Sequence, residues 1–111
     1  MMENNLYQSS SLNLDISIVT YNSSKWLDNF FDSLEKQNFP LKNISIFVRD
    51  NGSSDNTIQI FNDYKNRKEA AYRGINIESG ENVGFGRGHN ANLAHATAPF
   101  FLVTNVDLTF E

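Results

Sequence analysis

Three short polar segments in this sequence carry side chains that could bind a polar or charged ligand. The first is Thr20-Tyr21-Asn22, where a hydroxyl and an aromatic ring could meet a flat polar group such as a nucleobase. The alternative is structural: Tyr21 packs against the helix that follows and Asn22 caps that helix. The segment by itself leaves both interpretations open.

The second segment, Asp50-Asn51-Gly52-Ser53-Ser54-Asp55, places a carboxylate directly after an apolar run. A carboxylate there can accept a hydrogen bond from the imide N–H of a pyrimidine base, a charge-assisted bond with a net value of about 1.5 to 3 kcal/mol. The alternative is an ordinary turn with Asp50 as its Asx residue and Asp55 as a helix cap. We keep the cap for Asp55 and expect Asp50 to contact a ligand.

The third segment is Asn105-Val106-Asp107, which follows the apolar run 100–104. An apolar strand needs no carboxylate at its end in order to fold, whereas a divalent cation that bridges a diphosphate needs an oxygen ligand at such a position. We therefore expect Asp107 to bind a metal ion. Without the other segments, Asp107 would be interpreted as an exposed turn residue.

A glycine-rich stretch, 81–90, lies between the last two segments. Its small residues let backbone N–H groups approach a ligand, and Arg87 either contacts a diphosphate or lies in solvent. It is a weak dinucleotide fingerprint, because it follows the third apolar run of the chain and lacks the full glycine spacing. His89 and His95 have no partner cluster in the sequence, and we assign neither a role.

The elements that must position these segments alternate regularly. Apolar runs at 14–20, 44–49, 75–78 and 100–104 predict strands, and the stretches after the first three predict helices. The first helix should stop by Pro40 and bury Trp26, Leu27, Phe30, Phe31 and Leu34. The second should start at the Asp55 cap and carry Ile58, Phe61 and Tyr64. The third, around 90–96, should follow a loop at 80–88.

Alternating strands and helices predict a Rossmann-like α/β fold with a doubly wound, mainly parallel sheet. Ligands of such sheets bind at the carboxyl ends of the strands. The polar segments should therefore meet there, with Asp50 and Asp107 in one crevice.

Composition narrows the class of protein further. The chain has 111 residues, the size of one domain, and its net charge of −4 with scattered basic residues argues against nucleic acid as a partner. The absence of Cys excludes disulfides and Cys-based zinc sites, and no apolar run reaches the roughly 20 residues of a membrane span. We expect a cytoplasmic chain with a flexible leader at 1–12 and one folded unit at 13–111.

Four blocks, in this order, resemble the family-two glycosyltransferases of the GT-A fold, especially the rhamnosyltransferase-like branch. The matching residues are 16–22 (ISIVTYN), 48–55 (VRDNGSSD), 82–90 (NVGFGRGHN) and 104–107 (TNVD). The resemblance runs from Leu14 to the end of the chain. It implies the N-terminal, nucleotide-sugar-binding half of a GT-A domain, a nucleoside diphosphate sugar donor, and a divalent cation, Mn²⁺ or Mg²⁺.

The resemblance also implies roles for individual residues. Thr20 and Tyr21 would flank the base and Asp50 would hydrogen-bond it. Asn105 stands where the family has the first Asp of its Asp-x-Asp signature, so a neutral amide takes the place of a carboxylate at the ribose or sugar contact, while metal binding remains with Asp107. The expected nucleotide-sugar-binding residues are Thr20, Tyr21, Asn22, Asp50, Asn51, Asn82, Gly84, Arg87 and Asn105.

The family places its acceptor site and its catalytic base after the Asp-x-Asp signature, which here would be beyond Glu111. The resemblance thus implies that the full-length enzyme transfers sugar to a saccharide or lipid-linked acceptor hydroxyl, with inversion, in cell-wall or polysaccharide biosynthesis. The 111-residue chain should bind donor without turning over and self-associate through an open sheet edge near 100–110. The alternatives are a non-catalytic nucleotide-binding or assembly module, and a nucleotidyltransferase, whose basic glycine-rich loop after the first strand is not seen.

Overall fold

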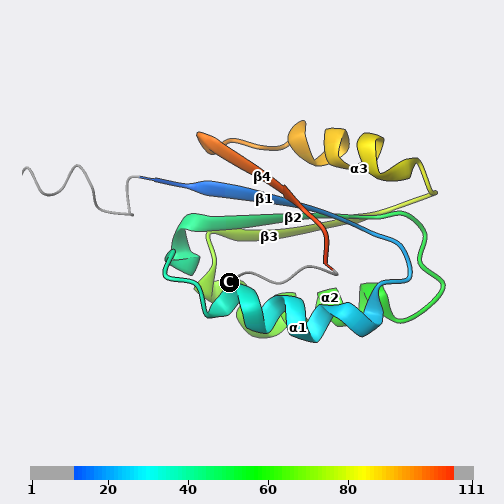
Figure 1. The fold of residues 1–111 in the computed structure, drawn as a ribbon, viewed down its shortest axis with the longest axis horizontal. Helices are drawn as coiled ribbons and strands as arrows, with labels where there is room; N and C mark the ends of the chain where they lie inside the picture. Colours follow the sequence, from blue (N-terminus) through cyan, green and yellow to red (C-terminus); the bar gives the residue numbers. More distant parts are fainter. Residues whose placement is uncertain (1–11, 107–111) are drawn as a thin grey trace, which may run out of the picture.

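The fold, obtained as a computed structural model, is described for residues 12–106 and consists of one sheet with helices on both faces (Figure 1). In chain order the elements are β1 (Leu14–Thr20), α1 (Ser24–Glu35), η3 (Leu41–Asn43), β2 (Ile44–Asp50), α2 (Thr57–Lys68), η4 (Glu69–Ala71), β3 (Gly74–Ser79), α3 (Gly84–Leu93) and β4 (Phe100–Thr104). The sheet has the strand order β3-β2-β1-β4, and every pairing is parallel. Helices α1 and α2 cover one face and α3 lies on the other. The predicted doubly wound α/β fold is confirmed.

The strand register places the polar segments at one end of the sheet, where the parallel strands have their carboxyl ends. Thr20 is paired with Asp50 at the carboxyl ends of β1 and β2. On the other side of β1, Ile18 is paired with Thr104, so the segment after β4 starts at the same end of the sheet. Strand β1 therefore stands between the two segments that were expected to share a crevice.

The core lies between the sheet and helices α1 and α2. Leu27, Phe30, Phe31 and Leu34 of α1 are buried, as their helical spacing predicts. The ring of Phe31 stacks on Tyr64 of α2 with 3.6 Å between centroids. The prediction for Trp26 was wrong: its side chain is 39% exposed, because it stands one position before Leu27, at the margin of the apolar face.

The boundary of α3 also differs from the prediction. The glycines at 84, 86 and 88 were expected in a loop, but they form the first two turns of α3. Glycine has a low helix propensity, which is why the sequence indicated a loop there. At Gly88 the missing side chain serves packing, since a Cβ atom would lie 2.8 Å from Cγ2 of Val19. Close contact with β1 thus overrides local propensity.

Candidate functional site

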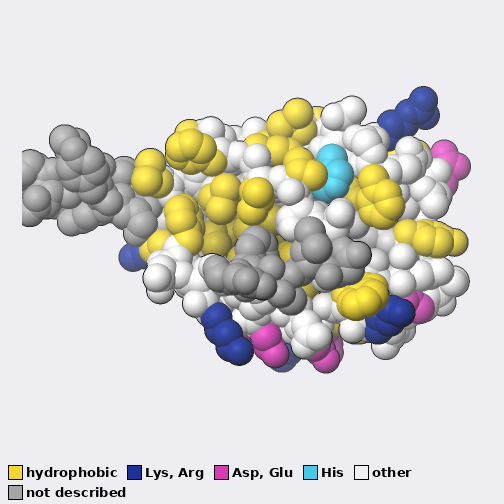
Figure 2. Space-filling view, viewed as in Figure 1, with side chains coloured by type: hydrophobic (Ala, Val, Ile, Leu, Met, Phe, Trp, Pro, Cys, Tyr) yellow, Lys and Arg dark blue, Asp and Glu magenta, His cyan; other side chains and the backbone are white. Residues whose placement is uncertain are grey.

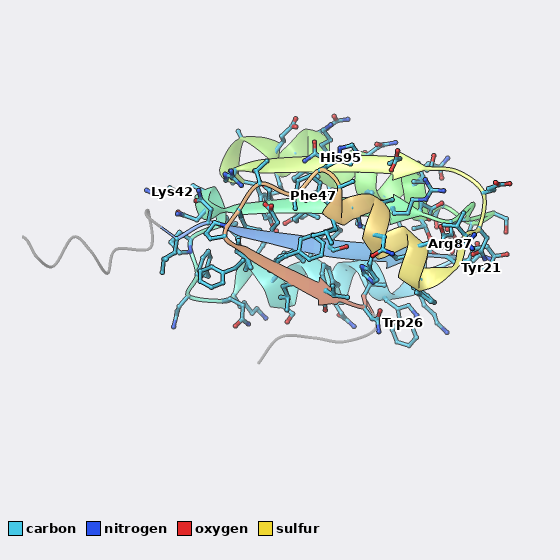
Figure 3. The ribbon with its side chains drawn as sticks, turned by 90° about the horizontal axis from the view of Figure 1, so that it is seen from above. Tyr21, Trp26, Lys42, Phe47, Arg87 and His95 are labelled. Atoms are coloured by element: carbon cyan, nitrogen blue, oxygen red, sulfur yellow. The ribbon has the colours of Figure 1, made fainter. Side chains whose placement is uncertain are left out.

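A cavity lies at the point where the strand order of the sheet reverses. Strands β1, β2 and β3 follow one another in one direction, and β4 is added on the opposite side of β1. Ligands of doubly wound sheets bind at this switch point. The cavity has a volume of about 570 Å³ and is lined by Val19, Ser23, Trp26, Phe85, His89, Val103, Asn105 and Val106. Tyr21, Trp26 and Arg87 lie at this end of the molecule, and Lys42 lies at the opposite end (Figure 3).

Thr20 and Asp50, at the carboxyl ends of β1 and β2, are hydrogen-bonded to each other and are not among the residues that line this cavity. The Thr20 hydroxyl donates to Asp50 Oδ1 across 2.8 Å, and both side chains are buried. The two Asp50 oxygens also accept hydrogen bonds from the Ser53 hydroxyl, the Gly52 N–H and the Ser53 N–H, at 2.6, 3.2 and 2.8 Å. A carboxylate has about four acceptor positions, so these bonds occupy it. The Asx-turn role of Asp50 is confirmed, and contact of Thr20 or Asp50 with a nucleobase stays a prediction.

Asn22 fastens the loop after β2 instead of capping α1. Its backbone is in the left-handed region, with φ of 50°, which Asn tolerates better than most residues. Its Oδ1 accepts the N–H groups of Ser54 and Asp55 at 2.8 and 3.3 Å. Tyr21 beside it is 49% exposed, so its ring is open to a ligand and is not packed into the core.

Asp55 stabilises the starts of two helices. Its Oδ1 accepts the N–H of Thr57, the first residue of α2, at 3.0 Å; the N-cap itself is Asn56, so the predicted cap is one residue off although Asp55 does stabilise this helix start. Its Oδ2 accepts the N–H of Ser24 at 3.3 Å at the start of α1. Burial raises the pKa of Asp55, but the hydrogen bonds from Thr57 and Ser24 outweigh it and hold this pKa below its usual value.

Four more of the residues expected to bind the nucleotide sugar, Asn51, Asn82, Gly84 and Arg87, lie at or near the start of α3. Asn51 is buried and donates from Nδ2 to the Gly84 carbonyl at 3.2 Å. The exposed Asn82 accepts the Gly84 N–H at 2.9 Å, and Gly84 has φ of 84°, which favours glycine. Arg87 points into solvent at this end of the molecule (Figure 3). These contacts tie the start of α3 to the loop after β2; they do not test ligand binding.

His89 was assigned no role from the sequence, but the structure places it in the cavity. Its Nδ1 lies 2.7 Å from Oγ of Ser17, and the Asn92 amide also contacts that hydroxyl at 2.8 Å. Burial lowers the pKa of His89. His89 and Asn92 are three residues apart and so share one face of α3, which was the only signal for the cluster in the sequence.

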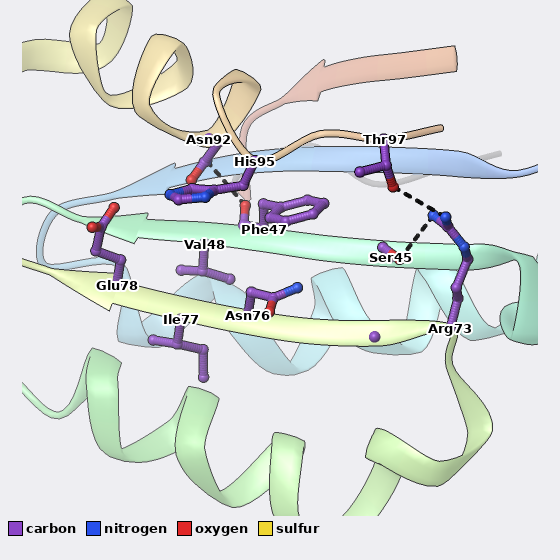
Figure 4. A pocket seen from close by; sticks show the side chains of 11 residues that line it. Ser45, Phe47, Val48, Arg73, Asn76, Ile77, Glu78, Asn92, His95 and Thr97 are labelled. Carbon is purple, nitrogen blue, oxygen red and sulfur yellow. Dashed lines mark hydrogen bonds between the residues drawn. The ribbon is translucent and has the colours of Figure 1, made fainter. Parts of the chain in front are cut away.

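A second cavity, of about 650 Å³, lies over β2 and β3 beside α3 (Figure 4). Arg73 closes one end of it with hydrogen bonds to Ser45 and Thr97 at 3.3 and 3.1 Å and an ion pair with buried Asp15 at 3.2 Å. None of the residues predicted to bind a ligand lines this cavity. Its lining combines apolar and polar residues of β2, β3, α3 and the segment after α3.

The predicted metal ligand Asp107 lies outside the described residues. Asn105, two positions earlier, lines the cavity at the switch point. Within residues 12–106, no group of three His, Asp or Glu side chains is placed to hold a metal ion. In that same part of the chain, no helix combines the length and apolar character required to cross a membrane.

The sequence is similar to that of characterised sugar-transferring enzymes. The chain is 31% identical over 96 residues to the poly(ribitol-phosphate) beta-N-acetylglucosaminyltransferase TarS of Staphylococcus aureus, covering 86% of this chain and 16% of that protein. It is 32% identical over 93 residues to the validoxylamine A glucosyltransferase of Streptomyces hygroscopicus, covering 84% of this chain and 22% of that protein. The chain thus spans about a fifth, or less, of the length of these relatives.

Solved structures share the fold. The crystal structure of TarS residues 1–349 superimposes with a TM-score of 0.74 at 30% identity, covering 86% of this chain and 28% of that one. The mannosyltransferase PcManGT of Pyrobaculum calidifontis superimposes with a TM-score of 0.77 at 21% identity, covering 86% and 27% of the two chains. The family model described as glycosyl transferase family 2 matches residues 15–111. The chain therefore belongs to glycosyltransferase family 2.

Proposed function

We propose that this chain is the donor-binding part of a glycosyltransferase and that it binds a nucleoside diphosphate sugar in the cavity between β1 and β4. The observation that carries the proposal is the position of that cavity, at the switch point and next to the segments after β1 and β4. TarS has been solved with UDP and with UDP-GlcNAc, and PcManGT with GDP-Man and Mn²⁺. These ligands of similar proteins support the same class of donor here.

The exposed residues around the cavity suit different parts of the donor. The exposed Tyr21 would offer a ring face to the base, and Arg87 and the polar groups at the start of α3 would contact the diphosphate. The buried side chains of Thr20, Asp50 and Asn51 hold the loops after β1 and β2 in place through the hydrogen bonds described above. The donor contacts of Tyr21, of Arg87 and of the start of α3 are part of the proposal.

Asp107 would hold a divalent cation, with the donor diphosphate supplying further oxygen ligands. When bound, such a cation stabilises the charge that develops on the departing diphosphate. Asn105 stands close to this position in the chain and lines the cavity, which supports a contact of its amide with the sugar or ribose of the donor. In the whole enzyme, a carboxylate outside this chain would deprotonate an acceptor hydroxyl as it attacks the anomeric carbon, which inverts the configuration.

Calorimetry with UDP, dTDP and GDP, each with and without Mn²⁺, tests donor binding. We expect binding of at least one nucleotide to depend on Mn²⁺ and to disappear in Asp107→Ala. Asp63→Ala is a suitable control because Asp63 is exposed on α2. Failure of all three nucleotides to bind would refute the proposal and would favour an assembly module without a donor site. Measured sugar transfer by the 111-residue chain would refute the expectation that the catalytic base lies elsewhere.

A further inference from the structure

Ser17 is a wholly buried hydroxyl in the middle of β1, and two side chains of α3 contact it. The orientation of the first of these, Asn92, is fixed. Its Nδ2 lies 3.2 and 3.0 Å from the backbone carbonyls of Ile18 and Phe47, which can only accept hydrogen bonds. The amide nitrogen must therefore face the strand, and its two N–H groups are shared among these carbonyls and Ser17 Oγ, at 2.8 Å.

This arrangement determines which nitrogen of His89 carries the proton. Ser17 has one hydroxyl proton, and His89 Nδ1 at 2.7 Å is its acceptor. If Nδ1 were instead a donor, the Ser17 proton would have no acceptor among residues 12–106, and an unsatisfied buried donor is costly. The Ser17 hydroxyl thus donates to Nδ1, and the proton of the neutral ring stands on Nε2. The lowered pKa of His89, caused by burial, agrees with a neutral ring.

The cavity beside His89 suits an uncharged, hydroxyl-bearing group. Its walls are formed largely by Val19, Trp26, Phe85 and Val103, and no Lys or Arg is among the described residues that line it. A buried charge needs a charged or metal partner, and the proposed function gives the diphosphate such partners at Arg87 and at the cation held by Asp107, away from these walls. A sugar ring carries no charge and presents apolar faces together with hydroxyl oxygens that accept hydrogen bonds.

We propose that His89 donates its Nε2–H to a hydroxyl oxygen of the donor sugar, and that Ser17 and Asn92 act as positioning residues that hold the ring in this tautomer. The inference rests on the proposed function and deepens it, since it assigns the sugar, and not the nucleotide, to the cavity wall at His89. Ring nitrogens with a fixed donor role discriminate between ligand groups, because a mismatched group leaves the donor unpaired.

The tautomer can be measured without any ligand. Long-range ¹H–¹⁵N correlation spectra distinguish a protonated Nε2 from a protonated Nδ1. We expect the His89 ring of the unaltered chain to be neutral at pH 7.5 with its proton on Nε2, and Ser17→Ala to lose this preference. A proton on Nδ1 in the unaltered chain would overturn the proposal.

Binding to sugar nucleotides gives the second test. Calorimetry compares UDP with UDP-GlcNAc, and GDP with GDP-mannose, for the unaltered chain and for two variants. The shorter side chain in His89→Asn keeps a hydrogen-bond acceptor near Ser17 but has no donor that reaches the cavity. The longer side chain in His89→Gln can place an N–H near the Nε2 position. We expect His89→Asn to weaken sugar-nucleotide binding about threefold to tenfold, the effect of one hydrogen bond, and to leave binding of the plain nucleotide within about twofold. His89→Gln should recover most of the loss.

The outcomes separate this inference from the function on which it rests. Equal weakening of plain and sugar-bearing nucleotides, or no weakening of either, would overturn the role of His89 while leaving donor binding intact. If the unaltered chain bound no nucleotide at all, the proposed function would be refuted, and the inference with it. Thermal unfolding of both variants shows whether the fold is preserved.

Discussion

Gly88 of α3 lies directly against Val19 of β1, with no room for a side chain between them. A Cβ atom at Gly88 would stand 2.8 and 2.9 Å from the two methyl carbons of Val19. Because His89 and Asn92 follow on the same helix, this contact also sets how close they come to the sheet. The height of α3 above β1 is therefore fixed by the absence of one methyl group.

We expect Gly88→Ala to lower the free energy of unfolding by about 1 to 3 kcal/mol through overpacking. Urea unfolding followed by circular dichroism measures this value. Val19→Ala in the same chain should recover part of the loss, because it removes the clashing methyl groups. Gly86→Ala is the matched control, since a Cβ atom at Gly86 would meet none of the described residues within 4 Å apart from its chain neighbours and the backbone of its own helix. Equal destabilisation by both glycine substitutions would contradict the packing argument.

Asp50→Asn should destabilise the chain even without ligand. The substituted amide would turn an N–H₂ group toward hydrogen-bond donors that now meet a carboxylate, and leaving such groups unpaired costs about 1 to 3 kcal/mol. Urea unfolding of Asp50→Asn and of the exposed control Asp63→Asn gives the comparison. Unchanged stability of Asp50→Asn would show that the carboxylate does not hold the turn.

Stability should fall at alkaline pH because of two buried tyrosines. Burial raises the pKa of Tyr64, with the Glu35 hydrogen bond adding to it, and burial raises the pKa of Tyr72 to about 12. The unfolded chain loses these protons near pH 10.0, before the folded chain does, so the stability they contribute is complete below that pH and is lost as the pH rises further. Melting temperatures between about pH 9 and 12 should therefore decline, and less steeply in Tyr72→Phe. Tyr21→Phe, at an exposed position, should leave the slope unchanged.

The free edge of β4 should promote self-association. In the part of the chain that the structure describes, β4 pairs only with β1, and Phe100 is 55% exposed. Figure 2 shows hydrophobic side chains gathered on this face of the molecule. An open edge with apolar residues pairs readily with other chains. We expect Phe100→Lys to shift the chain toward the monomer in sedimentation velocity at high concentration; a chain that is monomeric without the substitution would contradict this expectation.

The regular parts of the fold could be predicted because each residue pattern had one structural solution. The β-branched run of β1 and the helical spacing of α1 lead directly to a parallel sheet covered by helices. The start of helix α3 was predicted wrongly, since it depends on the contact between Gly88 and Val19, which local propensity does not contain. The same reason hid His89, whose role arises from Ser17, 72 residues away in the sequence.

The position of the polar segments at the carboxyl ends of the strands was predicted from the sequence, whereas the hydrogen bonds that their side chains make within the protein were not. Asp50 stands where expected, but its oxygens are engaged by the loop, and such bonds depend on backbone geometry that a sequence motif does not specify. Trp26 shows the reverse: a residue expected in the core forms part of the cavity wall. Asp107 and its metal site lie outside the described residues and stay predictions.

The link between Asn22 and the loop after β2 has a consequence for recognition. Hydrogen bonds join two turns that are 31 residues apart in the chain. The Asn22 N–H donates to Ser53 Oγ at 2.8 Å, and the Asn22 amide oxygen accepts hydrogen bonds from two backbone N–H groups of the loop after β2. A ligand that arrives over Tyr21 meets a preorganised platform, so the entropy of ordering these turns is lost during folding and does not weaken binding. Cutting this link, as in Asn22→Ala, would move that entropic penalty to the moment of association.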